Sequence, residues 1–286
     1  MTSERLRTYF TEDLGWGWSH QAKAVFALLT HAARDCTGGA ILDAGAGRQR
    51  YRPFFEEHSL YLAMEHPQGI AHKGMVDLTY DLLGELDERI PLEEDCLHGV
   101  INTSVLEHVR RPERFIAEAH RVLRPGGRLY TNVPFTYPEH EEPYDYQRPT
   151  SYALRSWLAD AGFVDVEVVP TSSNLSAAVA FVEEALRWDL AAVGRPDEHH
   201  RLTALAAPVL EELRRVGDGL VHAETRFPIG WVAIGRKVGT LEPAGTLDRA
   251  AFLDRHRSLS RTDSGRRHET WTPPSTSPMP TAPPST

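Results

Sequence analysis

The sequence predicts an α/β fold in which a mostly parallel sheet carries helices on both faces. Short apolar runs alternate along the 286-residue chain with segments of helical periodicity, which is the pattern of strands joined by crossover helices. A glycine-rich turn over residues 43–47 also follows the first apolar run. Sheets of this class bind nucleotides at such strand-to-helix turns.

The expected elements follow in chain order. A helix over residues 21–33 precedes strands over 40–43 and 60–65, a third strand around 74–78 and a fourth over 100–103. The next helix begins with Pro112 and stops at a turn over 124–127, before a strand over 128–133. Thr150 is expected to cap a further helix that stops at Gly162. Strands over 164–169 and 229–236 enclose two amphipathic helices.

The length indicates one large domain with additions. Residues 1–240 are expected to form the domain, with 171–226 as a helical insertion or lid and 241–286 as a mostly disordered C-terminal extension. The last 15 residues, 272–286, hold six prolines and no charged residue. Such a segment buries too little apolar surface to offset its chain entropy.

Charge and composition exclude several classes of protein. The net charge of −9 repels phosphate backbones, so nucleic acid is not an expected partner. No apolar run approaches the roughly 18 residues of a membrane span, and the charged N-terminus lacks the pattern of a signal peptide. The two cysteines, Cys36 and Cys96, are expected to be free thiols. We therefore expect a cytoplasmic protein, either a monomer or a homodimer, without a membrane partner.

The glycine turn favours one kind of nucleotide. It contains Asp43, Ala44, Gly45 and Gly47, but Arg50 stands where the dinucleotide fingerprint requires a third glycine. A carboxylate within the turn repels phosphate and suits a cationic group. Glu65 ends the next strand, where it can accept both hydroxyls of a ribose. A ligand with a cationic end, a ribose and no phosphate is S-adenosylmethionine; the alternatives are an ordinary tight turn and a surface carboxylate.

Five segments resemble the class I S-adenosylmethionine-dependent methyltransferases, in particular the bacterial group typed as methyltransferase domain 11 or 23. They are ILDAGAG (41–47), LAME (62–65), IPLEEDCLHGVINTSVLEHV (90–109), RFIAEAHRVLRPGGRLYTNVP (114–134) and RPTSYALRSWLADAGF (148–163). The resemblance covers about residues 36–170. It implies a Rossmann-like sheet of seven strands whose last strand is antiparallel, and S-adenosylmethionine as cofactor.

The resemblance also implies roles for individual residues. The 43–47 turn would line the methionine end of the cofactor and Glu65 the ribose, while Asn102 and Thr103 would offer backbone groups. Two features depart from the family: His98 replaces an aspartate before the fourth strand, and the acid that holds the adenine is ambiguous. Its candidates are Asp77, Asp81 and Asp87, of which Asp81 is favoured.

The loop over residues 135–148 is the expected site of chemistry, because it opens at the cofactor end of the sheet. His140 is the candidate general base or substrate contact, and a surface histidine is the alternative. Asp145 is the second catalytic candidate; alternatively it pairs with Arg148, with Tyr146 packed beneath. No metal site is expected, because Tyr144 stands where an HExxH motif needs its second histidine. The Glu107-His108 pair is expected to order the turn beneath the cofactor.

The leading hypothesis is a methyltransferase that acts on a small molecule, such as a sugar or secondary metabolite. O-methylation is the favoured reaction, and an amine or carbon acceptor is the alternative. Aromatic candidates for its pocket walls are Trp16, Trp18, Tyr137 and Trp188. A second hypothesis keeps S-adenosylmethionine bound without methyl transfer, as in a structural subunit, cyclase or decarboxylase. A third is a nicotinamide-dependent dehydrogenase.

Overall fold

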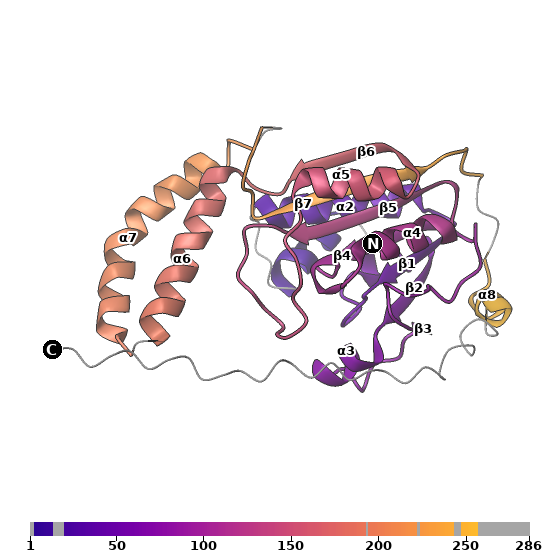
Figure 1. Ribbon diagram of the computed structural model, residues 1–286, viewed down its shortest axis with the longest axis horizontal. Coiled ribbons are helices and arrows are strands. Elements are labelled where there is room, and N and C mark those ends of the chain that lie inside the picture. Colours follow the sequence, from indigo (N-terminus) through magenta and orange to yellow (C-terminus); the bar gives the residue numbers. More distant parts are fainter. Residues whose placement is uncertain (1–2, 14–19, 193, 222–223, 243–246, 257–286) are drawn as a thin grey trace.

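The computed structural model describes residues 3–13, 20–192, 194–221, 224–242 and 247–256 (Figure 1). The strands are β1 (Ala40–Ala44), β2 (Leu60–Glu65), β3 (Leu82–Leu83), β4 (Leu97–Thr103), β5 (Leu123–Pro134), β6 (Phe163–Pro170) and β7 (Gly230–Lys237). The helices are α1 (Ser3–Thr8), α2 (His20–Asp35), α3 (Pro67–His72), α4 (Pro112–Val122), α5 (Ser151–Asp160), α6 (Asn174–Ala192), α7 (Pro196–Gly217) and α8 (Arg249–His256). Shorter helical segments are η1 (Tyr9–Asp13), η2 (Arg52–Phe54) and η3 (Leu106–His108).

The seven strands form one sheet in the order β3-β2-β1-β4-β5-β7-β6. The pairs from β3 to β5 are all parallel, whereas β7 is antiparallel to both β5 and β6. The predicted α/β fold, with a mostly parallel sheet and an antiparallel last strand, is confirmed. The carboxyl ends of β1, β2 and β4 therefore meet at one edge of the sheet.

Two apolar cores lie on the two faces of this sheet. One includes Phe115 of α4, Leu154 of α5 and Phe252 of α8. The other includes Val25 and Leu29 of α2. Side chains alternate between the faces along β1, so that Leu42 belongs to the first core and Ile41 to the second. Helices on both faces keep the central strands buried, as the apolar runs predict.

Two strand predictions need correction. The third strand is β3 at Leu82–Leu83, not residues 74–78, which lie in turns before it. β5 also begins at Leu123, ahead of the predicted start. Leu97 pairs with Leu123 and Gly99 with Arg128, so the glycine-rich segment between them forms a bulge within β5. Gly126 has a φ of +83° there, a conformation that favours glycine.

The predicted helix cap at Thr150 is confirmed. Its hydroxyl accepts a hydrogen bond from the backbone N–H of Ala153 at 3.2 Å, in the first turn of α5. Gly162 follows that helix with a φ of +95°, as expected of a glycine that ends a helix.

His98, which replaces the aspartate of the resembled family, lies inside β4. Its Nδ1 accepts a hydrogen bond from the backbone N–H of Ala40 at 3.1 Å. Burial lowers the pKa of His98 to about 4, so the ring is neutral. This bond joins the start of β1 to the start of β4, at the end of the sheet opposite the glycine turn.

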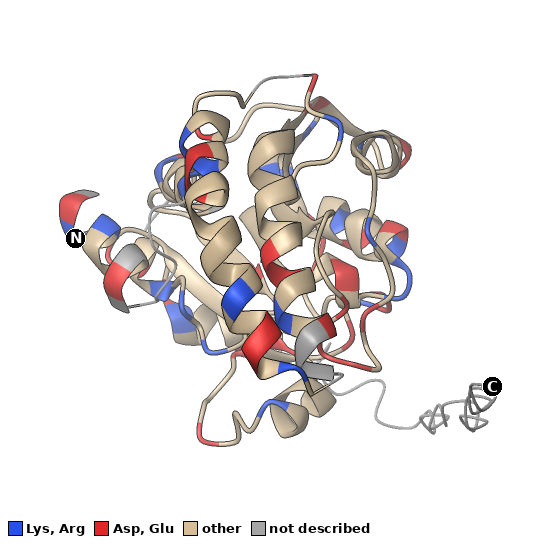
Figure 2. Cartoon of the chain, turned by 90° about the vertical axis from the view of Figure 1, so that its left-hand side faces the viewer, with Lys and Arg blue, Asp and Glu red and all other residues tan. Residues whose placement is uncertain are grey.

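The insertion between β6 and β7 is a helical hairpin of α6 and α7 that projects beside the body (Figure 1). It starts at the carboxyl end of β6. Ser172 and Asn174 anchor it, because their side chains accept hydrogen bonds from the backbone N–H groups of Ile229 and Phe227. Acidic and basic residues are mixed on the side of the molecule that this hairpin occupies (Figure 2). Its role as a lid stays a prediction.

Part of the C-terminal extension packs on the domain. Phe252 of α8 is buried in a core, and Arg249 donates a hydrogen bond to the carbonyl of Tyr61 at 2.9 Å. Residues 257–286, where disorder was expected, lie outside the described residues. Both cysteines are free thiols, as predicted, with Cys36 buried. No helix among the described residues has the length and apolar character needed to cross a membrane.

Candidate active site

The glycine turn follows β1 at the carboxyl edge of the sheet. Gly45 has a φ of +84° and Gly47 a φ of +50°. A Cβ on Gly45 would lie 2.5 Å from the side chain of Val105, whereas a Cβ on Gly47 would meet no atom within 4 Å. Glycine is thus required at position 45, both because a Cβ would clash with Val105 and because the backbone is left-handed. At Gly47 the backbone is also left-handed, but open space lies beside it.

Glu65 ends β2 beside this turn. Its Oε2 accepts a hydrogen bond from the backbone N–H of Gly47 at 2.7 Å, and its Oε1 accepts one from His66 at 2.9 Å. The carboxylate therefore lies beside the backbone of the glycine turn.

Asn102 holds the turn from the neighbouring strand. Its side-chain amide donates to the carbonyl of Ala44 at 2.8 Å, and the side chain is fully buried. The sequence suggested only backbone groups at Asn102 and Thr103. The structure adds a side-chain link between the ends of β4 and β1.

Asp43 is buried at the end of β1, where its carboxyl accepts a hydrogen bond from the hydroxyl of Tyr61. Burial raises the pKa of Asp43 to about 7, an effect that the Tyr61 hydrogen bond and the charge of Arg52 only partly oppose. A positive charge brought near this carboxyl would favour its ionised form.

The loop over residues 135–148 carries His140, and Asp145 orients it. The backbone N–H of His140 donates to Asp145 at 2.9 Å, and the same carboxylate pairs with Arg148 at 2.5 Å. Although burial opposes it, the Arg148 guanidinium holds the pKa of Asp145 below its ordinary value. Asp145 thus forms the predicted pair with Arg148 and positions His140.

Tyr146 does not pack beneath this pair. Its hydroxyl accepts a hydrogen bond from Arg110 at 3.1 Å, and the guanidinium of Arg110 lies over its ring. Tyr146 is also partly exposed. The loop is fastened instead by Gln147, whose side chain donates to the carbonyls of Leu106 and Val109.

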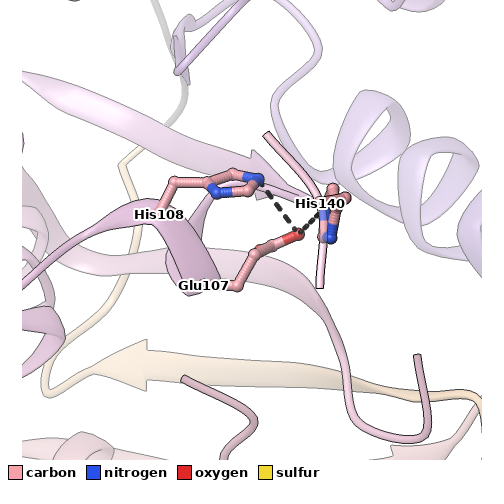
Figure 3. Close-up of side chains that lie close together, drawn as sticks. All are labelled: Glu107, His108 and His140. Carbon is pink, nitrogen blue, oxygen red and sulfur yellow. Dashed lines mark ion pairs between the residues drawn. The ribbon is translucent and has the colours of Figure 1, made fainter. Parts of the chain in front are cut away.

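His140 meets Glu107 and His108, which lie on η3 just after β4 (Figure 3). The Nε2 atoms of both histidines lie 3.7 Å from Oε1 of Glu107, and the centroids of the two imidazole rings are 4.8 Å apart. Glu107 is fully buried, and it is the main cause of the raised pKa of His140. The sequence placed Glu107 and His108 beneath the cofactor; it did not predict that His140 joins them.

Comparison with known proteins supports one family. Residues 42–131 match the family described as a methyltransferase domain. A protein named "Probable S-adenosylmethionine-dependent methyltransferase" from Mycolicibacterium smegmatis is 28% identical over 57% of this chain and 65% of its own length. A protein of the same name from Mycobacterium tuberculosis is 28% identical over 56% of this chain and 60% of its own length. The matches thus span less than two thirds of these relatives.

Residues 42–131 of this chain are therefore similar to a methyltransferase domain. A solved structure from Thermotoga maritima, titled as an S-adenosylmethionine-dependent methyltransferase and "possible histamine N-methyltransferase", aligns with 82% of this chain and 94% of its own. The TM-score is 0.47 and the identity 16%.

The methyltransferase domain fits S-adenosylmethionine, the cofactor of its family. A Cβ on Gly47 would meet no atom within 4 Å, so the turn has open space beside it. Glu65 accepts a hydrogen bond from the N–H of Gly47 and so places a carboxylate beside the turn, which suits the two ribose hydroxyls. Asp43 supplies a second carboxyl near the turn, suited to the cationic methionine end.

In the structure, the carboxylate of Asp81 has partners other than the predicted adenine. Its carboxylate accepts a hydrogen bond from the backbone N–H of Ala63 at 2.9 Å and pairs with Arg249 of α8. Among the other candidates, Asp77 is exposed and Asp87 pairs with Arg111 at 3.1 Å. Glu85, not weighed from the sequence, follows β3 at the carboxyl edge and lies 3.1 Å from His66. Its position after a two-residue strand is visible only once β3 is placed.

The proposed aromatic walls are only partly described. Trp16 and Trp18 lie outside the described residues. Tyr137 packs edge-on against His140, with ring centroids 5.2 Å apart. Trp188 is largely exposed on α6, where its Nε1 donates to Glu184 at 3.0 Å. Tyr137 therefore borders the candidate catalytic histidine.

Proposed function

We propose that this chain is an S-adenosylmethionine-dependent methyltransferase that methylates a hydroxyl group of a small molecule. The observation that carries this proposal is the pairing of His140 with the buried Glu107 at the carboxyl edge of the sheet. Glu107 follows β4, and β4 pairs directly with β1, which leads into the glycine turn. The acid-base pair and the cofactor turn therefore belong to neighbouring strand ends.

When bound, the cofactor would supply a methyl group on a sulfonium: the acceptor oxygen would form a bond to the methyl carbon as the S–C bond breaks, and the neutral thioether would leave. The hydroxyl proton must leave the acceptor during this step. Nε2 of His140 is suited to accept it, since Glu107 stabilises the resulting imidazolium. Oδ2 of Asp145 lies 3.2 Å from Nδ1 of His140, on the opposite side of the ring from Nε2, and this contact keeps Nε2 facing Glu107.

A small acceptor suits the charges around the site. The chain carries a net charge of −9, which disfavours polyanions such as nucleic acid. Tyr137 offers an aromatic face beside His140, against which the ring of a sugar or a secondary metabolite can pack.

The test is to incubate the full chain with methyl-labelled cofactor and panels of hydroxylated small molecules. We expect a labelled product, with turnover lowered about 100-fold or more in His140→Ala while the affinity for S-adenosylhomocysteine is kept. His58→Ala is the matched control, because this histidine is exposed and paired only loosely with Glu57 at 3.9 Å. Retained cofactor without a labelled product in any panel would support the second hypothesis, a cofactor-binding protein that transfers no methyl group.

A further inference from the structure

The carboxylate of Glu107 is buried without hydrogen bonds. Neither of its oxygens has a hydrogen-bond partner among the described residues. Two imidazoles face it instead, with Nε2 of His108 and Nε2 of His140 each 3.7 Å from Oε1 (Figure 3). A carboxylate in this state has lost its water without gaining hydrogen bonds, which costs free energy. A cation between these three groups would remove that cost.

The contact between His108 and the carbonyl of Tyr144 determines which ring nitrogen carries the hydrogen and which carries the lone pair. Its Nδ1 lies 2.8 Å from the carbonyl oxygen of Tyr144. Because a carbonyl oxygen only accepts, Nδ1 carries the hydrogen. In the neutral ring, Nε2 then turns its lone pair toward the cluster.

The same argument applies to His140. Its Nδ1 lies 3.2 Å from both the carbonyl of Pro138 and the carboxylate of Asp145. Nη2 of Arg148 is also 3.3 Å away, but its two hydrogens point to Pro138 at 2.8 Å and Asp145 at 2.6 Å. In the neutral ring, Nδ1 therefore donates and Nε2 carries the lone pair. Metal-binding histidines are held in this way, through a carbonyl or carboxylate on the other ring nitrogen.

Two of the carboxylates near the two rings already have a lysine or arginine partner, and Glu107 has none of this kind in the part of the chain that the structure describes. Glu141 faces His108 at 3.7 Å, but Lys73 pairs with it at 2.6 Å. Asp145 is paired with Arg148 at 2.5 Å. Of the three carboxylates that border the two rings, Glu107 is thus the one without a lysine or arginine partner among the described residues.

We propose that Glu107, His108 and His140 bind one divalent transition-metal ion, for which Zn²⁺ is the best match. Their three ligand atoms lie within 4.8 Å of one another. Zn–N and Zn–O distances of about 2.0–2.2 Å in a tetrahedral site separate the ligand atoms by roughly 3.4 Å, so side-chain shifts of about 1 Å close the site. Two imidazoles and a carboxylate are a zinc donor set, and three protein ligands leave a fourth position open.

This inference goes beyond methyl transfer, because metal binding is a property of its own. The ion takes the place that a proton takes on Nε2 of His140. In a metal-loaded chain, His140 would serve as a ligand and the ion would lower the pKa of an acceptor hydroxyl at the open position; in a metal-free chain, Nε2 of His140 would accept the proton.

The experiment uses the full chain without a polyhistidine tag, stripped with a chelator and titrated with Co²⁺ while its visible absorption is followed; Zn²⁺ then competes. We expect one Co²⁺ per chain, displaced by Zn²⁺, and an affinity at least about 100-fold lower in His108→Ala, in His140→Ala and in Glu107→Gln. His58→Ala should match the unmodified chain. Absence of a visible band in the unmodified chain, or equal affinity in the double variant His108→Ala/His140→Ala, would overturn the proposal.

Calorimetry with S-adenosylhomocysteine on the same samples separates this inference from the proposed function. A chain that binds S-adenosylhomocysteine but no Co²⁺ or Zn²⁺ refutes the metal site alone. A chain that binds the metal but no S-adenosylhomocysteine refutes the proposed function alone. Circular dichroism of each variant shows whether a lost signal reflects lost folding.

Discussion

A Cβ on Gly45 would lie only 2.5 Å from Cγ1 of Val105, which is closer than two such carbon atoms can approach. Gly45 belongs to the cofactor turn, and Val105 directly precedes η3, which carries Glu107 and His108. The contact therefore joins the cofactor turn to the proposed site of chemistry. A change at either residue is expected to move the other.

Gly45→Ala should lower the free energy of unfolding by more than Gly47→Ala. Both substitutions strain a left-handed backbone, by about 1–2 kcal/mol, but only the first adds a clash with Val105. Gly47→Ala should instead keep most of its stability and weaken S-adenosylhomocysteine binding, because its methyl group enters the open space of the cofactor site. Urea unfolding and calorimetry of the two variants check this, and equal losses of stability would contradict it.

Asp43→Asn should change how stability depends on pH. The pKa of Asp43 is raised from 3.8 to about 7 in the folded chain. Between these values the folded state binds more protons than the unfolded state, so this carboxyl makes the unfolding free energy fall as pH rises from about 4 to 7. The loss is at most about 4 kcal/mol. The unfolding free energy of the unmodified chain should therefore fall between pH 5 and pH 8, and that of Asp43→Asn should not show this fall. The variant should compare more favourably with the unmodified chain at pH 8 than at pH 5.

Urea unfolding at both pH values measures this difference. Glu88→Gln, a change at an exposed acid outside the site, is the control and should follow the unmodified chain. If the Asp43→Asn profile ran parallel to that of the unmodified chain, the carboxyl would titrate alike in the folded and unfolded states.

Glu65→Gln should lower the affinity for S-adenosylhomocysteine by about 10- to 100-fold. The amide oxygen can still accept from Gly47, but it loses the charge that strengthens hydrogen bonds to the ribose, which are worth about 1.5–3 kcal/mol with a charged partner. Calorimetry measures the dissociation constant, again with Glu88→Gln as the control. An unchanged constant would remove Glu65 from the cofactor site.

Asp81→Asn should destabilise the chain and leave cofactor affinity unchanged. Its carboxylate is nearly buried and holds Arg249 of α8, so the loss is about 1–3 kcal/mol. Limited proteolysis should release α8 more readily in this variant and in Arg249→Ala than in Arg255→Ala, a change at an exposed arginine on the same helix. Weaker S-adenosylhomocysteine binding without loss of stability would instead return Asp81 to the adenine site.

The sequence by itself determined the elements and the local turns. Apolar periodicity predicts β2 to the residue, and the hydroxyl of Thr150 caps α5 within a few residues of itself. The turn with Gly45 and Gly47 is equally local, because its backbone conformation depends on those glycines. Such features need only neighbouring residues, so a pattern along the chain reveals them.

Only the tertiary structure decided which distant side chains meet. Asp81 and Arg249 are 168 residues apart in the chain, and they form an ion pair. Asp81, predicted to bind the adenine, thus contacts α8. Likewise, the meeting of His140 with Glu107 requires η3 and the 135–148 loop to follow β4 and β5, which are neighbours in the sheet. Strand order sets these contacts, and periodicity along the sequence does not determine which strands are neighbours in the sheet.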